Sequence, residues 1–131
     1  MGVVVVDTSV WIDFLAGRPV PGLLESLSYG GAVLPPVVAA ELISGARHPS
    51  DRKQIEDLVA GLVFFEAPLE HWIRVGELRL LLKGKGLALT IPDAHVAQCA
   101  LDLDALLLTR DAVFTRVAKF TRLRVRADGQ V

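Results

Sequence analysis

The sequence holds one cysteine, one methionine and few aromatic residues, which make up 6% of its 131 residues. A single cysteine excludes an intrachain disulfide and a cysteine-based zinc site, and it is typical of a reducing compartment. No run of about 18 uninterrupted apolar residues exists, so we expect no membrane span. The first residues also lack the basic segment of a signal peptide. These absences predict a cytoplasmic protein.

Net charge is low, at −1, so the total charge predicts no polyanionic partner and only local clustering could attract one. Apolar residues are abundant by contrast, at 52% of the chain. So high a share favours a sheet covered by helices on both faces, with some apolar surface left for a partner. Because no repeat or low-complexity linker divides the chain, we predict a single domain over residues 1–131.

Short apolar runs alternate with helical patterns along the chain. The sequence predicts strands at 3–6, 32–34, 62–66, 105–108 and 123–125. Between them it predicts helices at 10–16, 22–29, 35–46, 51–59, 68–82, 92–101 and 111–120, most of which begin at a proline or end at a glycine. This alternation is typical of βαβ units with right-handed crossovers. We therefore expect an α/β fold, with three α/β/α layers and a central, mostly parallel sheet of about five strands.

The stretch VVVVDTSVWIDF, at 3–14, places an acid directly after a fully apolar strand. Four valines predict a central strand buried on both faces. Asp7 then stands at the carboxyl edge of the sheet, where ligands bind in open α/β folds. Thr8 or Ser9 would cap the helix that follows. Asp13 lies nearly two turns further along that helix, and we expect it to be structural or to lie at the rim of a site.

Three further acids stand in surroundings unlike a solvated surface. Asp111 follows the second apolar strand, in ALLLTRDAVF, and Asp93 begins a helix, in TIPDAHVAQCA. Glu41 is the only charge in GGAVLPPVVAAELISG. Taken singly, Asp93 and Asp111 could stabilise helix N-termini, and Glu41 could face solvent. If all four acids converge, their carboxylates would repel one another unless a divalent cation neutralised them, and carboxylate oxygens favour Mg²⁺ or Mn²⁺ over zinc.

The ordered segments DTSVWIDF, PVVAAELISGA, PDAHVAQCA and LLTRDAVF resemble the motifs of PIN domains, over nearly the whole chain. Within that family, the compact single-domain chain resembles the VapC-type toxins. The resemblance implies a metal-dependent endoribonuclease that acts as the toxin of a toxin–antitoxin pair. The four acids of the family match Asp7, Glu41, Asp93 and Asp111. His95 departs from the pattern, since the family carries an aliphatic residue there, and it is either a core histidine or faces substrate.

The resemblance also assigns roles within the site. Asp7 and Asp93 would bind Mg²⁺ or Mn²⁺ directly, and Glu41 and Asp111 would complete the site partly through bound water. A water or a phosphate oxygen would accept a hydrogen bond from Thr8, Ser9 or Thr109. The expected reaction is in-line hydrolysis of an RNA phosphodiester. The family further implies a homodimer and a cognate antitoxin that inserts an arginine into the acidic pocket.

Basic residues gather towards the C-terminus, where Asp111 is the only acid from 110 to 126. Arg122, Arg124 and Arg126 stand at alternate positions, which predicts that they share one face of the final strand. We expect phosphate contacts from Arg110, Arg116, Lys119 and Arg122. The alternative is a solvated edge strand whose charges oppose aggregation.

Other classes of protein fit the pattern less well. A phosphoaspartyl phosphatase would need a second acid two residues after Asp7, where Ser9 stands. A non-catalytic signalling domain with an acidic Mg²⁺ site would need a lysine after the late apolar strand, which ends in Thr109, Arg110 and Asp111. A housekeeping RNA-processing PIN nuclease would carry the same acids, and only the small size favours the toxin.

Overall fold

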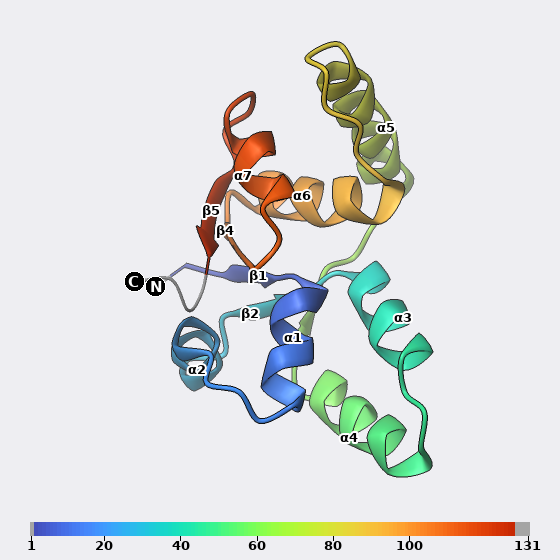
Figure 1. Ribbon diagram of the computed structural model, residues 1–131, viewed down its shortest axis with the longest axis vertical. Helices are drawn as coiled ribbons and strands as arrows, with labels where there is room; N and C mark the ends of the chain where they lie inside the picture. The colour runs from blue at the N-terminus through green and yellow to red at the C-terminus, as the bar shows by residue number, and fades with distance from the viewer. Residues whose placement is uncertain (1, 128–131) are drawn as a thin grey trace.

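The computed structural model describes residues 2–127 (Figure 1). Its strands are β1 (Val4–Val6), β2 (Ala32–Leu34), β3 (Val63–Phe64), β4 (Leu106–Thr109) and β5 (Arg124–Ala127). Its helices are α1 (Thr8–Leu15), α2 (Pro21–Ser28), α3 (Pro36–Ser44), α4 (Pro49–Ala60), α5 (Leu69–Lys83), α6 (Ile91–Leu103) and α7 (Val113–Ala118). Every predicted element is present, with ends shifted by a few residues.

The described strands form one parallel sheet in the order β3-β2-β1-β4-β5. The valine strand β1 is central, with Val4 opposite both Ala32 of β2 and Leu106 of β4. The chain runs from β1 to β2 and β3 on one side, then crosses back to β4 and β5 on the other. The direction of winding therefore reverses between β1 and β4, and such a reversal opens a crevice at the carboxyl ends of the strands.

Helices cover both faces of the sheet, as the apolar excess predicted. Figure 1 shows α1 to α4 on one side of the strands and α5 to α7 on the other. Right-handed crossovers require this division, because the two halves of the sheet are wound in opposite directions. α5 packs chiefly against α6, which in turn contacts β1 and β4. The α/β/α prediction is confirmed.

The core lies between the central strands and these helices. Val5 and Val6 of β1, and Leu107 and Leu108 of β4, are buried, which explains their unbroken apolar run. No helix within residues 2–127 combines the length and apolar character needed to cross a membrane.

One local prediction is wrong. Thr8 and Ser9 do not cap α1, because the helix already begins at Thr8 and Asp7 occupies the capping position. Asp7 makes no side-chain capping bond there. Its carboxylate accepts hydrogen bonds from Ser9 and Thr109 instead.

Candidate functional site

Asp7 lies at the crevice between β1 and β4 because of the strand register. Val6 stands opposite Leu108, and the Asp7 amide donates to the Leu108 carbonyl at 3.0 Å. The next residue of β4, Thr109, is therefore level with Asp7. Its hydroxyl donates to Oδ2 of Asp7 at 2.9 Å, and the Ser9 hydroxyl donates to the same oxygen at 2.8 Å. Asp7 is only 7% exposed, so these two hydroxyls fix the orientation of a nearly buried carboxylate.

Glu41 comes to the same edge from α3. The Thr8 hydroxyl donates to Oε1 of Glu41 at 2.7 Å across 33 residues of sequence, and α1 packs against α3. Glu41 is exposed, as the solvent-facing alternative expected, but its carboxylate is held against Thr8, the first residue of α1. The helix pair thus brings the second predicted acid next to the residue that follows the first.

Asp93 belongs to the first turn of α6 and is half-buried. Thr90 caps this helix, since its Oγ1 accepts the Asp93 amide at 3.2 Å, so Asp93 is not itself the cap. Burial raises the pKa of Asp93, the hydrogen bond with Thr90 opposes the rise, and the negative charges of Asp111, Asp7 and Glu41 add to it. The four predicted acids therefore share one electrostatic environment at the carboxyl edge of the sheet.

Asp111 lies at the outer rim of this group. Its amide donates to Oγ1 of Thr109 at 3.0 Å, and its Oδ1 accepts the Val113 amide at 3.0 Å. One carboxylate oxygen therefore binds the first amide of α7, although Ala112 occupies the capping position, so Asp111 stands at a helix N-terminus as the structural alternative expected. Asp111 is exposed, as Glu41 is, whereas Asp7 and Asp93 are more enclosed.

Positive side chains near this edge pair with a different acid. Asp13, buried on α1, forms ion pairs with both Arg18 and Arg110. This agrees with a structural or rim position for Asp13. The remaining Arg and Lys ion pairs within residues 2–127 lead to Glu25, Glu56, Asp57, Asp102 and Asp104.

The donor set at the edge therefore fits a hard divalent cation. It consists of four carboxylates, three of which add to the raised pKa of Asp93, together with neutral hydroxyls that donate to Asp7 and Glu41. Mg²⁺ prefers one or two direct carboxylates together with bound water. The nearly buried Asp7 and the half-buried Asp93 would hold the ion directly, with the more exposed Glu41 and Asp111 reaching it through water.

The basic residues divide between two edges of the sheet. Arg110 stands beside the acids and is held by Asp13, whereas Arg116 is exposed on α7. Lys119 and Arg122 lie beyond the end of α7, at the opposite edge. The prediction that Arg122 alternates with Arg124 and Arg126 along the last strand is wrong, because β5 begins only at Arg124.

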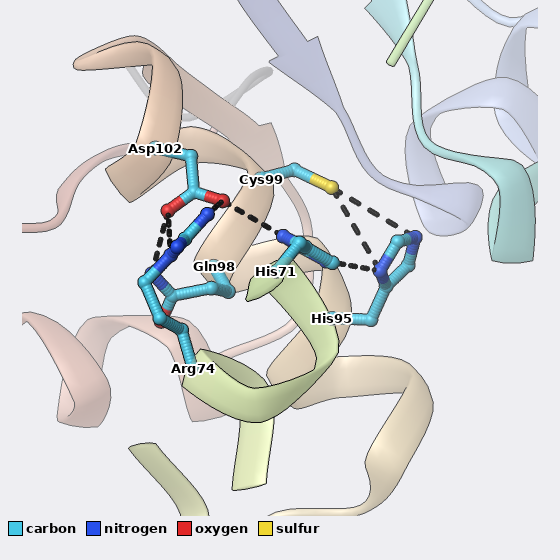
Figure 2. A network of polar contacts seen from close by, with 6 residues as sticks. All are labelled: His71, Arg74, His95, Gln98, Cys99 and Asp102. Carbon is cyan, nitrogen blue, oxygen red and sulfur yellow. Dashed lines mark hydrogen bonds and ion pairs between the residues drawn. The ribbon is translucent and has the colours of Figure 1, made fainter. Parts of the chain in front are cut away.

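A buried polar network that no sequence pattern indicated lies between α5 and α6 (Figure 2). The His71 and His95 rings are fully buried, and Nε2 of His71 lies 2.7 Å from Nδ1 of His95. Nδ1 of His71 lies 2.8 Å from Oδ2 of Asp102. The two oxygens of the Asp102 carboxylate also accept two hydrogen bonds from Arg74 and one from Gln98. His95 is thus a core residue, and the substrate-facing alternative is wrong.

The carboxylate at the outer end of this network fixes the position of one proton. Burial would raise the pKa of Asp102, but hydrogen bonds from Arg74, His71 and Gln98 lower it to about 2. An ionised Asp102 only accepts, so Nδ1 of His71 carries a proton. One hydrogen bond joins Nε2 of His71 to Nδ1 of His95, and the Cys99 sulfur lies 3.8 Å from Nε2 of His95.

The network holds a potential ligand set, since atoms of His71, His95 and Cys99 lie within 4.8 Å of one another. Two nitrogens on one tetrahedral zinc ion, each about 2.0–2.1 Å from the metal, would stand about 3.4 Å apart. The His71 and His95 nitrogens are closer, at 2.7 Å. Cys99 Sγ is almost equidistant from both His95 nitrogens, at 3.9 and 3.8 Å. These distances describe hydrogen bonds that brace α5 against α6. Sequence reasoning could note only that His95 and Cys99, four apart, share a helix face.

The parallel sheet, the crossover pattern and the acidic crevice define a class of α/β protein with a carboxylate site at the strand ends. A family model of the PIN domain matches residues 4–120, and the chain belongs to this family. PIN domains are generally nucleases. No curated protein matches the sequence.

Several solved structures share the fold. The VapBC2 complex of Rickettsia felis bound to a promoter DNA fragment aligns with a TM-score of 0.79 and 20% identity, covering 96% of this chain and 98% of that chain. VapBC-1 of nontypeable Haemophilus influenzae aligns with a TM-score of 0.77 and 22% identity, covering 95% of this chain and 96% of that chain. VapBC-5 of Mycobacterium tuberculosis is a member of the VapBC family of toxin–antitoxin systems. It aligns with a TM-score of 0.67 and 21% identity, covering 95% of this chain and 98% of that chain.

Proposed function

We propose that this chain is a Mg²⁺-dependent endoribonuclease that acts as the toxin of a toxin–antitoxin pair. The observation that carries the proposal is Asp7, a nearly buried carboxylate that two hydroxyls orient within an environment shared by three further acids. Such a cluster is costly without a cation. A PIN domain with this cluster fits hydrolysis of a phosphodiester bond better than a binding role alone.

The burial and the hydrogen bonds of the four acids suggest two different roles among them. When bound, Mg²⁺, or Mn²⁺ in its place, would supply a Lewis acid for the phosphate and a bound water of lowered pKa. Asp7 and Asp93 would hold the ion, and Glu41 and Asp111 would orient its waters. Ser9 and Thr109 each keep Oδ2 of Asp7 in place, so the other oxygen remains for the cation.

The substrate would be bound so that the attacking water and the leaving oxygen are in line, and hydrolysis would leave a 5′-phosphate. Thr8 donates to Glu41 and thereby holds the outer carboxylate towards the crevice. The Arg110 guanidinium, fixed by Asp13 at the edge of the acids, would meet an RNA phosphate that approaches them. Each of these groups orients or binds, which is the main protein contribution to phosphate chemistry.

A pair of isosteric variants tests the proposal. Asp7→Asn keeps the shape of the side chain but removes its charge, and we expect it to abolish RNA cleavage while the circular dichroism spectrum stays native. Asp57→Asn is the control, because it makes the same chemical change at an exposed carboxylate on α4 that pairs with Lys53. It should cleave at close to the wild-type rate. Cleavage by Asp7→Asn at that same rate would show the assignment to be wrong.

The toxin role rests on the VapBC complexes that share the fold, which contain a toxin and its antitoxin. We expect a cytoplasmic homodimer with a small protein partner, and α5 exposes Leu69, Ile73 and Leu80 on one face that could support such contacts. An arginine of the partner would occupy the acidic crevice. Expression of the chain alone should arrest growth, Asp7→Asn should relieve the arrest, and co-expression of the adjacent reading frame should do the same. A housekeeping nuclease would cleave RNA but would cause no arrest that a neighbouring gene relieves.

A further inference from the structure

The connection from β4 to β5 carries basic residues from the acidic edge of the sheet to its opposite edge. Asp111 begins this connection beside the other acids, and Lys119 stands where α7 has returned the chain to the start of β5. α7 has six residues, so it is about 9 Å long. Arg116 lies near its middle and is exposed. The crossover is therefore a short path between the two edges, with a cation along it.

A wide groove lies at the far end of this path. It has a volume of about 1160 Å³ and is bounded by Ala105 and Leu123, which immediately precede β4 and β5, and by the facing parts of α5 and α6. Small-molecule pockets typically measure about 300–1,000 Å³. The groove is larger than these and partly open to solvent. Its size suits a segment of a polymer.

Cations and an aromatic ring line this groove. Arg74 and Lys85 come from α5 and the turn after it, and Lys119 and Arg122 from the turn after α7. Phe120 lies between the last two and is 43% exposed. Exposed phenylalanine flanked by basic residues is the combination that binds single-stranded nucleic acids, since bases stack on the ring and phosphates meet the cations.

The charges of the groove favour an anionic ligand. Of the acids on its wall, Asp102 is engaged by Arg74, and Asp104 faces Arg124 at 3.7 Å. Glu77 is the remaining acid of the lining. Three cations of the lining outnumber this one acid. They form no ion pair with any other residue in the described part of the chain, and they are Lys85, Lys119 and Arg122. A chain of net charge −1 thus concentrates uncompensated positive charge here.

The buried network described above fixes one wall of the groove. Arg74 donates from Nε and Nη2 to the two oxygens of Asp102, both at 2.9 Å, and Asp102 is held from within by His71 and Gln98 (Figure 2). The Arg74 side chain is nonetheless 45% exposed. Its planar guanidinium is therefore held in one orientation at the wall, with donors remaining for a phosphate.

We propose that this groove binds a single-stranded segment of the RNA substrate, which runs from the acidic crevice along α7. Lys85, Lys119 and Arg122 contact phosphates, and a base stacks on Phe120. The site extends the proposed function, because it would hold RNA outside the place where it is cut. Contacts of this kind raise affinity without reading the sequence.

Binding measured without cleavage tests the groove. Fluorescence anisotropy with a labelled single-stranded RNA, in EDTA, would compare the wild type with the triple variant Lys85→Gln, Lys119→Gln and Arg122→Gln. A matched control, Arg47→Gln, Arg52→Gln and Lys53→Gln, removes three exposed cations at and before α4. The three groove substitutions should reduce the slope of log K against log salt by about 2, at about 0.7 for each phosphate contact, and the control should leave it unchanged. Phe120→Leu should weaken binding about tenfold at constant slope.

Cleavage separates this proposal from the proposed function. The groove variant should raise KM for a long RNA and leave kcat unchanged when Mg²⁺ is present. Equal slopes and equal KM for the groove variant and the wild type would overturn the groove, even if cleavage depended on Asp7. Weaker RNA binding by the groove variant, with no cleavage by the wild type, would instead support the groove and contradict the nuclease. Loss of antitoxin binding with unchanged RNA binding would identify the groove as a protein-binding surface and would also overturn the proposal.

Discussion

The Thr109 hydroxyl donates to the Asp7 carboxylate at 2.9 Å, although the two residues are 102 positions apart. The contact follows from the pairing of two parallel strands, since Val6 lies opposite Leu108 and the next residues are level. The same hydroxyl accepts the Asp111 amide. Thr109 is only 1% exposed. Its hydroxyl therefore links Asp7, which follows β1, to Asp111, which follows β4, inside the protein.

Removing this hydroxyl should weaken the metal site. Thr109→Val keeps the volume and the β-branched shape but leaves Asp7 with one hydroxyl partner and the Asp111 amide with none. A hydrogen bond to a charged group contributes about 1.5–3 kcal/mol, so Mg²⁺ affinity should fall about tenfold or more. Isothermal titration with Mg²⁺ measures the loss. Thr109→Ser, which retains the hydroxyl, should remain within a few-fold of the wild type, and equal loss in both variants would contradict the role assigned to the hydroxyl.

The acids should make the metal-free protein less stable than it could be. Because burial and the neighbouring negative charges raise the pKa of Asp93, its ionised form is disfavoured in the folded state at neutral pH. Asp93→Asn should therefore raise the free energy of unfolding in EDTA, while abolishing the stabilisation that Mg²⁺ gives the wild type. Urea unfolding with and without Mg²⁺ measures both effects.

A neutral substitution on an exposed surface provides the comparison for Asp93. Asp57→Asn on α4 removes a carboxylate that is paired only with Lys53 at 3.5 Å. It should change stability by less than about 0.5 kcal/mol and preserve the response to Mg²⁺. If Asp93→Asn behaved in the same way, the four acids would not form one site.

The elements of this fold could be predicted because local patterns specify them. Four valines, paired prolines and glycines at helix ends mark strands and helices without reference to distant residues. The position of the two acids that follow strands could also be predicted, since the carboxyl ends of adjacent parallel strands lie at the same end of the sheet. Asp7 and Asp111 follow β1 and β4, which are indeed neighbours.

The contacts between helices could not be predicted in the same way. His71 and His95 are 24 residues apart, and only the packing of α5 on α6 makes them partners. The sequence likewise placed Arg110 and Arg122 in one basic stretch, whereas α7 carries them to opposite edges of the sheet. Ion pairs such as Arg110 with Asp13 depend on rotamers and on tertiary distance, which a periodic pattern does not encode.

Asp13 should prove important for stability and unimportant for the metal. Asp13 lies on α1, and its carboxylate forms ion pairs with Arg18 and Arg110. The Arg110 side chain is only partly exposed. Asp13→Asn should lower the free energy of unfolding by about 1 kcal/mol, since part of each pair is screened by solvent. Mg²⁺ titration should give the wild-type affinity. A tenfold loss of that affinity would place Asp13 among the ligands and would contradict its assignment to the rim.

His95 should make stability depend on pH below neutrality. Burial, together with the neighbouring His71, lowers the pKa of His95 to about 4, whereas an unfolded histidine titrates near 6.5. Between these values the unfolded chain takes up the proton and the folded one does not, so stability is complete above about pH 6.5 and declines as the pH falls towards 4. The full effect is about 3 kcal/mol at most. The raised pKa of Asp93 acts in the opposite direction, and the lowered pKa of Asp102 acts only below about pH 4, so the comparison must be made between variants. His95→Phe should flatten the decline measured by urea unfolding from pH 7 to pH 4, and His48→Gln, at an exposed position before α4, should not. A decline of the same steepness in His95→Phe and in the wild type would mean that another group governs the acid lability.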